Sequence, residues 1–256
     1  MSLTRFALRF AVKAPKIEAF ERYLFIGPHP DDIEVGAGAT AAKLAAAGRH
    51  VSFLICTDGR YGLGFAPEGT TPEQLAIARK AEAFASAKAL GVTDVHFLGL
   101  SDGALYGTDA LQRGIARVIG ETQPQLIFAP DPDVTSECHA DHKNTGEAAK
   151  RMAYFAPYRE LAAQYGAAAA DVQAIAFYMT AKPNRFVQTR GLLERQCSAL
   201  LCHKTQFPAD SDAYQSVRTY LKLRAADFGL RALCGQAEGF RVLNQTQMHC
   251  LPEAGR

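Results

Sequence analysis

The chain has 256 residues, of which 48% are hydrophobic and 21% charged, and its formal net charge is +2. This composition excludes a disordered chain, a coiled coil and a collagen-like repeat. No dense run of Lys and Arg is present, so neither nucleic acid nor a membrane surface is expected as a partner. No apolar stretch reaches the roughly 18 residues of a membrane helix, and the N-terminus lacks the core of a secretion signal.

The cysteines are widely spaced and form no CxxC pair; they are Cys56, Cys138, Cys197, Cys202, Cys234 and Cys250. Reduced, mostly buried thiols explain this spacing better than a disulfide framework does. Because such thiols are typical of a reducing compartment, we expect a cytoplasmic protein.

Residues 1–20 precede the first buried strand and are expected to form an N-terminal extension. Within it, residues 5–13 alternate four apolar side chains with smaller or basic residues. A period of two predicts a half-buried strand, and its outward Arg and Lys side chains would discourage pairing at the sheet edge.

From residue 22 onward, short apolar runs alternate with stretches of helical pattern. Strands are predicted at residues 23–26, 51–56, 95–98, 126–129 and 172–179. Helices are predicted at residues 40–47, 72–90, 109–121, from about 141, 192–202 and 213–228. The second helix has the clearest boundaries: Thr71 fits the N-cap, Pro72 the first position, Gln74 a capping box and Gly91 the end.

Strands separated by helices indicate right-handed βαβ units. We therefore expect an α/β fold, a three-layer Rossmann-like sandwich with a mainly parallel sheet and helices on both faces. Residues 1–256 are predicted to form a single domain, because no repeat, linker or composition break divides them. Residues 207–256 are expected to be a C-terminal helical region. The Ala-rich residues 154–171 are the best candidate for a surface excursion or a lid.

Polar side chains follow two of the predicted strands. The first strand is followed by His29, Asp31 and Asp32, and the fourth by Asp131, His139, Asp141 and His142. Ligands of open α/β sheets bind beyond the carboxyl ends of the strands. We therefore expect four carboxylate and three imidazole groups to meet at one edge of the sheet.

Carboxylates crowded at one place repel, and burying them without compensation is costly. A divalent cation removes this cost, and a mixed set of imidazole and carboxylate ligands suits zinc. The neighbouring side chains of Asp31 and Asp32 diverge, so both cannot easily bind one ion. One can hold the metal while the other stays free to take a proton from water.

Each residue has a plainer explanation when it is taken alone. His29 fits a turn, and Asp31 and Asp32 fit a helix cap. His139 and His142, one helical turn apart, fit a surface pair. Two such motifs at the ends of two strands of one sheet favour a functional site over coincidence.

The sequence HPDD at residues 29–32, followed by Gly36, and the later HADH at residues 139–142 together resemble the zinc-dependent de-N-acetylases. This family includes the N-acetylglucosaminyl-phosphatidylinositol de-N-acetylases (PIG-L) and the bacterial LmbE-like enzymes. The resemblance covers residues 22–206. Ala140 stands where the family often has Pro, and Cys138 where Gly is common, which affects loop shape and substrate rather than the metal.

The resemblance implies that His29, Asp32 and His142 are the metal ligands and that Asp31 is the general base. The expected cofactor is Zn2+, with Fe2+ or Mn2+ as replacements in the cell. The implied activity is that of an amidohydrolase, which removes the N-acetyl group of an N-acetylglucosamine-type amino sugar or a related small conjugate. The chemistry is consistent, since zinc brings the pKa of water toward ~7.

The resemblance also implies that His139 is the general acid, with Asp141 orienting it and raising its basicity. Arg79 would contact the substrate, although its spacing from Glu82 equally fits a surface pair. His203 would lie near the site, although a histidine there equally fits the end of a helix. Whether Asp31 or His139 protonates the leaving amine stays open.

Two alternatives of other classes stay open at this point. A metal-dependent phosphoesterase would hold two metals about 3.5–4 Å apart, with Asp131, Asp133 or Asp141 as extra ligands. A metal-dependent sugar-binding module without catalysis would have no need of the free Asp31. Assembly into a homo-oligomer also stays open, because both terminal regions leave surface for subunit contacts.

Overall fold

The computed structural model describes residues 11–249 and residue 251. The strands are β1 Arg22–Gly27, β2 His50–Thr57, β3 Asp94–Leu100, β4 Leu126–Pro130, β5 Ala174–Tyr178, β6 Arg185–Gln188 and β7 Ala237–Asn244. The helices are the 3-10 turn η1 Ile17–Ala19, α2 Asp32–Ala46, α3 Pro72–Leu90, α4 Thr108–Thr122, α5 Ala140–Phe155, α6 Arg159–Gln164, α7 Leu193–Leu200 and α8 Asp212–Arg231.

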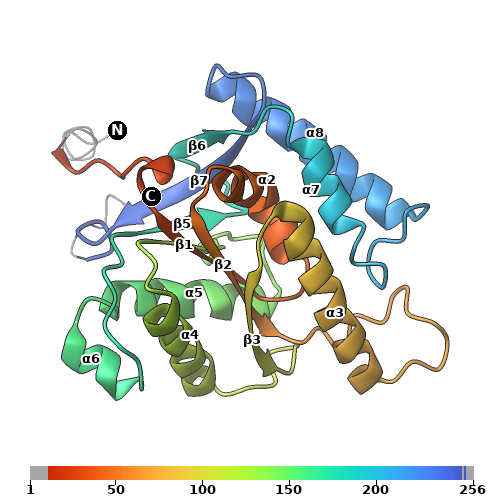
Figure 1. Ribbon diagram of the computed structural model, residues 1–256, viewed down its shortest axis with the longest axis horizontal. Coiled ribbons are helices and arrows are strands. Elements are labelled where there is room, and N and C mark those ends of the chain that lie inside the picture. The colour runs from red at the N-terminus through yellow and green to blue at the C-terminus, as the bar shows by residue number, and fades with distance from the viewer. Residues whose placement is uncertain (1–10, 250, 252–256) are drawn as a thin grey trace.

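Within these residues, the seven strands form one sheet in the order β3-β2-β1-β4-β5-β7-β6 (Figure 1). Strands β1 to β5 are parallel, and β7 runs antiparallel to both β5 and β6. From β1 the chain first builds outward through β2 and β3, and then returns to β4 on the other side of β1. This change of direction leaves a crevice beyond the carboxyl ends of β1 and β4.

Helices cover both faces of the sheet. Helices α2, α3, α7 and α8 lie on one face, and α4 and α5 lie on the other (Figure 1). The central strands are buried on both sides, which explains their continuous apolar runs. Each face has its own core, and the stacked rings of Phe25 and Phe128, 4.0 Å apart, lie in the core beneath α2. The predicted three-layer α/β fold is confirmed.

Helix α3 begins and ends as its local sequence predicts. The side chain of Thr71 accepts the N–H of Gln74, the side chain of Gln74 accepts the N–H of Thr71, and Gly91 ends the helix at φ 90°. Helix α2, in contrast, begins at Asp32 rather than at residue 40. Its first turns were missed because Asp31, Asp32 and Glu34 lack the apolar periodicity of a packed helix.

Two strands lie where none was predicted. The C-terminal region, expected to be helical, contains helix α8 but also β7, which inserts between β5 and β6. Glu238, Gly239 and Arg241 interrupt the apolar pattern of β7, yet the sheet buries Arg241 and the side chain of Glu238 is paired inside the protein. Sequence periodicity does not reveal a strand whose apolar pattern is interrupted by charged residues that are paired through tertiary contacts.

The predicted strand at residues 5–13 lies outside the described residues except for its last three, and those are in no strand. The candidate lid at residues 154–171 contains α6 and packs beside α4, where Gln123 donates to the carbonyl of Ala169. Because Gln123 precedes β4, this segment lies at the edge of the sheet opposite the crevice and cannot cover it. Among the described residues, no helix is long and apolar enough to cross a membrane.

Candidate metal and catalytic site

The turn between β1 and α2, residues 29–32, is the first of two segments at the crevice and is called the first turn below. The carboxylate of Asp32 accepts the backbone N–H of His29 at 2.9 Å and lies 3.0 Å from Nδ1 of the same residue. Asp31 adopts φ 123°, a conformation that non-glycine residues rarely take. Such strain is found at functional sites, where the surrounding structure holds it in place.

The segment between β4 and α5, residues 131–139, is called the second loop. It ends at His139, the N-cap of α5, whose Nδ1 accepts the N–H of Asp141 at 3.3 Å. This hydrogen bond places the proton of a neutral His139 ring on Nε2. His142 follows one helical turn later and faces the first turn, with its Nε2 3.4 Å from Oδ1 of Asp32.

The two segments bring together the residues that the sequence singled out. His29, Asp32 and His142 each offer one ligand atom, and these atoms lie within 4.8 Å of one another. The ring centroids of His29 and His142 are 5.4 Å apart, and the ring of His139 lies 4.7 Å from that of His29. The predicted convergence of the two strand-end motifs is therefore present in the fold.

The electrostatics of this cluster favour a positive charge at its centre. Burial works to lower the pKa of His29, but Asp141 and Asp32 outweigh it and raise the pKa to about 10. Burial works to raise the pKa of Asp32, but His142 and His29 hold it well below its ordinary value. The pocket thus stabilises a protonated imidazole between carboxylates, and a divalent cation suits the same surroundings.

Asp141 backs His29 rather than His139. Its carboxylate is fully buried, lies 3.1 Å from Nε2 of His29, and accepts the N–H groups of Gly103 and Ala104 at 2.7 and 2.8 Å. The distance to Nδ1 of His139 is 3.8 Å. With Nε2 of His29 facing Asp141, Nδ1 is left facing Asp32, as a metal ligand requires.

Asp31 stands beside the cluster. Its Oδ2 accepts a hydrogen bond from Nη2 of Arg79 at 2.9 Å, and Arg79 also donates to the carbonyls of Pro30 and Gly59. Burial raises the pKa of Asp31 to about 6, and the guanidinium of Arg79 opposes that rise. Arg79 itself is buried, so its contacts are made with the protein and its polar groups point at the first turn.

His203 is fully buried as well, and its Nε2 lies 3.3 Å from Oε1 of Glu34. Glu34 also accepts the hydroxyl of Ser86 at 2.5 Å. Burial would raise the pKa of Glu34, but His203 and Ser86 together lower it. The structure therefore buries His203 against Glu34, which lies at the start of α2.

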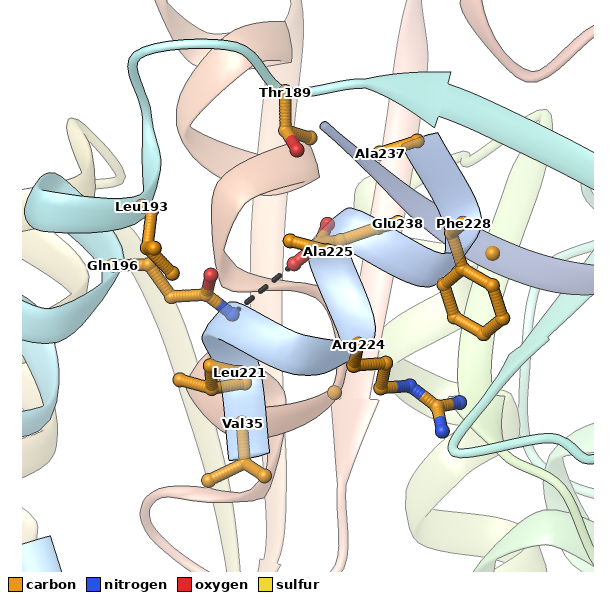
Figure 2. Close-up of a pocket in the computed structure, with 12 residues that line it drawn as sticks. Val35, Thr189, Leu193, Gln196, Leu221, Arg224, Ala225, Phe228, Ala237 and Glu238 are labelled. Atoms are coloured by element: carbon orange, nitrogen blue, oxygen red, sulfur yellow. Dashed lines mark hydrogen bonds between the residues drawn. The ribbon is translucent and has the colours of Figure 1, made fainter. Parts of the chain in front are cut away.

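Helix α2 is broken at Ala37, where φ is −153° and ψ is 15°. The amide of Gln196 donates to the carbonyl of Glu34 at 2.7 Å and to the carboxylate of Glu238 at 3.1 Å. Glu238 in turn accepts two backbone N–H groups just beyond the break. Figure 2 shows Gln196 pointing at Glu238 beside a hollow of about 360 Å³ that includes open solvent. These contacts satisfy the backbone groups that the break sets free.

The carboxylate of Asp131 is not available to a metal. Nε of Arg241 donates to its Oδ2 at 2.9 Å, and Nη2 of Arg241 contacts its other oxygen. Asp133 lies against the same guanidinium at 2.9 Å. Two of the three carboxylates that were expected to hold a second metal are therefore engaged by Arg241.

Several residues of the site were not predicted from the sequence: Glu34, Glu137, Gln196, Glu238 and Arg241. Glu137 carried a local signal, since it stands two residues before His139. Glu34 also stands close to a motif, two residues after Asp32. The other three come from α7 and β7, and only the tertiary fold brings them to the crevice.

Comparisons with known proteins agree with this geometry. The family model described as PIG-L, GlcNAc-PI de-N-acetylase, matches residues 24–153. Diacetylchitobiose deacetylase of Thermococcus kodakarensis is 32% identical over 250 residues, which are 96% of this chain and 92% of that protein. The chain belongs to the PIG-L family of de-N-acetylases, as the two motifs indicated.

Solved structures show the same fold. N,N'-diacetylchitobiose deacetylase from Pyrococcus horikoshii, in complex with its inhibitor MPG, matches with a TM-score of 0.85 and 30% identity, over 98% of this chain and 93% of that one. The 4-carboxy-2-hydroxymuconate hydratase GalB from Pseudomonas putida matches with a TM-score of 0.74 at 16% identity, over 87% of this chain and 96% of that one. The second likeness concerns the fold alone, because one fold serves several chemistries.

Proposed function

We propose that this chain is a zinc-dependent hydrolase that removes the N-acetyl group from an N-acetylglucosamine-type amino sugar. The observation that carries the proposal is the meeting of His29, Asp32 and His142 from two separate segments, with the buried carboxylate of Asp31 beside them. The two diacetylchitobiose deacetylases, which are similar to this chain over nearly its whole length, support the substrate class.

His29, Asp32 and His142 would hold the metal. Two imidazoles and one carboxylate are a common ligand set of catalytic zinc, which leaves a position open. Zinc bound there supplies Lewis acidity, which brings the pKa of water toward ~7 and polarises the acetamide carbonyl. The geometry supports the fit, since the three residues each offer one ligand atom and these atoms lie within 4.8 Å of one another.

Asp31 is the proposed general base, which takes a proton from water at its carboxylate. Arg79 donates to Oδ2 of Asp31 and fixes the direction of the carboxylate. Its burial favours this supporting part over the substrate contact that the sequence suggested. A positioned general base contributes roughly 10²–10⁴-fold to the rate of such a reaction.

His139 is the proposed hydrogen-bond donor to the acetamide oxygen, and the leaving amine takes the proton that Asp31 has removed from water. Its side chain is 49% exposed at the mouth of the crevice, and its Nδ1 is occupied by the N–H of Asp141, so Nε2–H faces outward as the donor. One donor to a developing oxyanion is worth about 3–4 kcal/mol. The backbone of Asp141 thus orients His139, while its carboxylate orients His29.

The alternatives are not favoured. A two-metal phosphoesterase would need Asp131, Asp133 or Asp141 as extra ligands. Asp131 and Asp133 lie against Arg241, and Asp141 accepts the N–H groups of Gly103 and Ala104 and lies against His29. A module that only binds sugar has no use for a strained, buried Asp31 held by an arginine. We also propose a cytoplasmic location, in keeping with Cys56, Cys138, Cys197, Cys202 and Cys234, which are free thiols among the described residues.

The proposal is tested by measuring acetate release from zinc-loaded protein given N-acetylglucosamine, diacetylchitobiose and further N-acetylated amines. We expect one acetate and one new primary amine per turnover, and loss of both when zinc is removed by a chelator. The variant Asp31→Ala, loaded with zinc, serves as the matched control and should be nearly inactive. If zinc is bound and no acylated amine in the panel is cleaved, the proposal is wrong.

A further inference from the structure

Glu137 lies at the end of the second loop, outside both motifs, and its carboxylate spans two residues of the site. Its Oε1 accepts the backbone N–H of His139 at 2.7 Å. Its Oε2 lies 3.3 Å from Nδ1 of His142. The side chain is 28% exposed, so one side faces solvent and the other faces the metal cluster.

His142 has one ring nitrogen for each of two neighbours. Nε2 faces Asp32 at 3.4 Å, which leaves Nδ1 on the outer side of the ring. Within the described residues, Nδ1 is buried and has no hydrogen bond, because Glu137 is within reach in distance but not in angle. A buried N–H without a partner costs about 1–3 kcal/mol, so a small rotation of either side chain is favoured.

The other imidazole of the cluster already shows the complete arrangement. Nδ1 of His29 faces Asp32, and its Nε2 lies 3.1 Å from the buried carboxylate of Asp141. Metal-binding histidines donate their outer N–H to a carboxylate or carbonyl in nearly every known site, which fixes the tautomer and raises ligand basicity. The carboxylate of Glu137 lies near the outer ring nitrogen of His142, just as the carboxylate of Asp141 lies near that of His29.

We propose that Glu137 is a positioning residue that accepts the Nδ1–H of His142 and holds its Nε2 toward the metal. The inference rests on the proposed function, since it takes His142 to be a metal ligand. The second loop then does more than connect β4 to α5: through one carboxylate it fixes the backbone of His139 and the ring of His142 together.

The test measures zinc affinity of the full chain, stripped of metal and titrated with zinc against a competing chelator. The variants are Glu137→Gln and Glu137→Ala, and Glu147→Gln is the control, because it removes the same charge from an exposed position on α5. We expect both Glu137 variants to bind zinc about 10–100-fold more weakly. Glu147→Gln should bind zinc as the wild type does.

Two further measurements decide how a result is assigned. Thermal unfolding of the metal-free proteins should be the same for wild type and Glu137→Gln, since the side chain is partly exposed and Gln keeps an acceptor for His139. Equal zinc affinity of wild type and both Glu137 variants, or a stability loss that accounts for the weaker binding, overturns the inference alone. If His142→Ala binds zinc as tightly as the wild type, the ligand set fails and both proposals fall.

Discussion

The first turn and the second loop supply one metal cluster by different means. The first turn is short and buried, and the side chains of His29 and Asp32 are only 10% exposed. Arg79 donates a hydrogen bond to the carbonyl of Pro30 in this turn, and α2 begins directly after it. The second loop is longer and open, and its His139 is 49% exposed. The turn therefore suits groups that must not move, and the loop suits a group that meets the substrate.

The same contrast appears in what holds each segment. Glu34, Gln196 and Glu238 satisfy the backbone of the broken helix that follows the first turn. The second loop is held at its start by the pair of Asp131 with Arg241 and at its end by Glu137. Substitutions in the first turn should therefore lower the stability of the fold, whereas substitutions at the end of the second loop should lower the metal affinity alone.

The largest effects are expected from the ligands themselves, and they distinguish the two segments. His142→Ala should lose zinc affinity by more than the roughly 100-fold that marks the upper range for supporting residues. Asp32→Ala should lose zinc too, and should also destabilise the metal-free protein by about 1–3 kcal/mol, because it removes the acceptor of the buried N–H of His29, while Asp141 still pairs with the ring. Zinc titration and urea unfolding of the metal-free variants measure both. An equal loss of stability in His142→Ala and Asp32→Ala would contradict the difference between the two segments.

Asp31→Ala should keep zinc and lose turnover. Removing the general base lowers kcat by roughly 10²–10⁴-fold. Zinc affinity should stay near that of the wild type, since Asp31 does not belong to the ligand cluster in the described residues. Acetate release and zinc titration on the same preparation measure the two effects. Wild-type turnover in this variant would remove Asp31 from the role of base.

The start of the second loop can be tested through its buried ion pair. Arg241→Ala leaves the buried carboxylate of Asp131 without its cation, while the N–H of Asp133 still donates to it, and we expect a loss of about 3–5 kcal/mol in the free energy of unfolding. The double variant with Asp131→Ala should lose less than the sum of the two single variants, because the residues act on one another. Additive losses in urea unfolding would show that the pair does not anchor the loop.

The contacts of Glu238 with α2 make the stability of the protein depend on pH. Burial raises its pKa to about 7, although Thr40 and Ala39 donate to it and Arg224 lies nearby. Between the ordinary value of 4.5 and 7 the folded protein then binds more protons than the unfolded chain, so stability falls as pH rises through this range. The fall is up to about 3 kcal/mol. Glu238→Gln should show a flatter profile in unfolding from pH 5 to 8, and an unchanged slope would contradict this.

Cys138 should show the smallest effect. It is exposed on the second loop beside His139, and among the described residues it does not belong to the groups that could hold a metal. Cys138→Ala should change the free energy of unfolding by no more than about 0.5 kcal/mol, as exposed substitutions usually do. Acetate release should stay within a factor of two. A large loss of turnover with zinc still bound would instead indicate that the thiol of Cys138 takes part in the reaction.

The sequence predicted what depends on local signals. The ends of α3 follow from Thr71, Gln74 and Gly91, and the meeting of His29 with His142 follows from the rule that strand ends of a parallel sheet share an edge. The ligand set and the roles of Asp31 and His139 came from the family resemblance, and they stay proposals.

Contacts made across the fold could not be predicted in this way. The strand β7 could not be predicted because Glu238 and Arg241 interrupt its apolar pattern and find their partners on α2 and the second loop. Arg79 and His203 were expected near the substrate; both are buried, and they pair with Asp31 and Glu34. Burial of a charged group depends on partners distant in sequence, which periodicity does not report.

The most direct test is anomalous diffraction at the zinc absorption edge from crystals grown with added zinc. We expect one strong peak per chain, in contact with His29, Asp32 and His142 and not with Asp31 or Asp131. A peak bound by other residues, or no peak between the first turn and the second loop, would contradict the proposed centre.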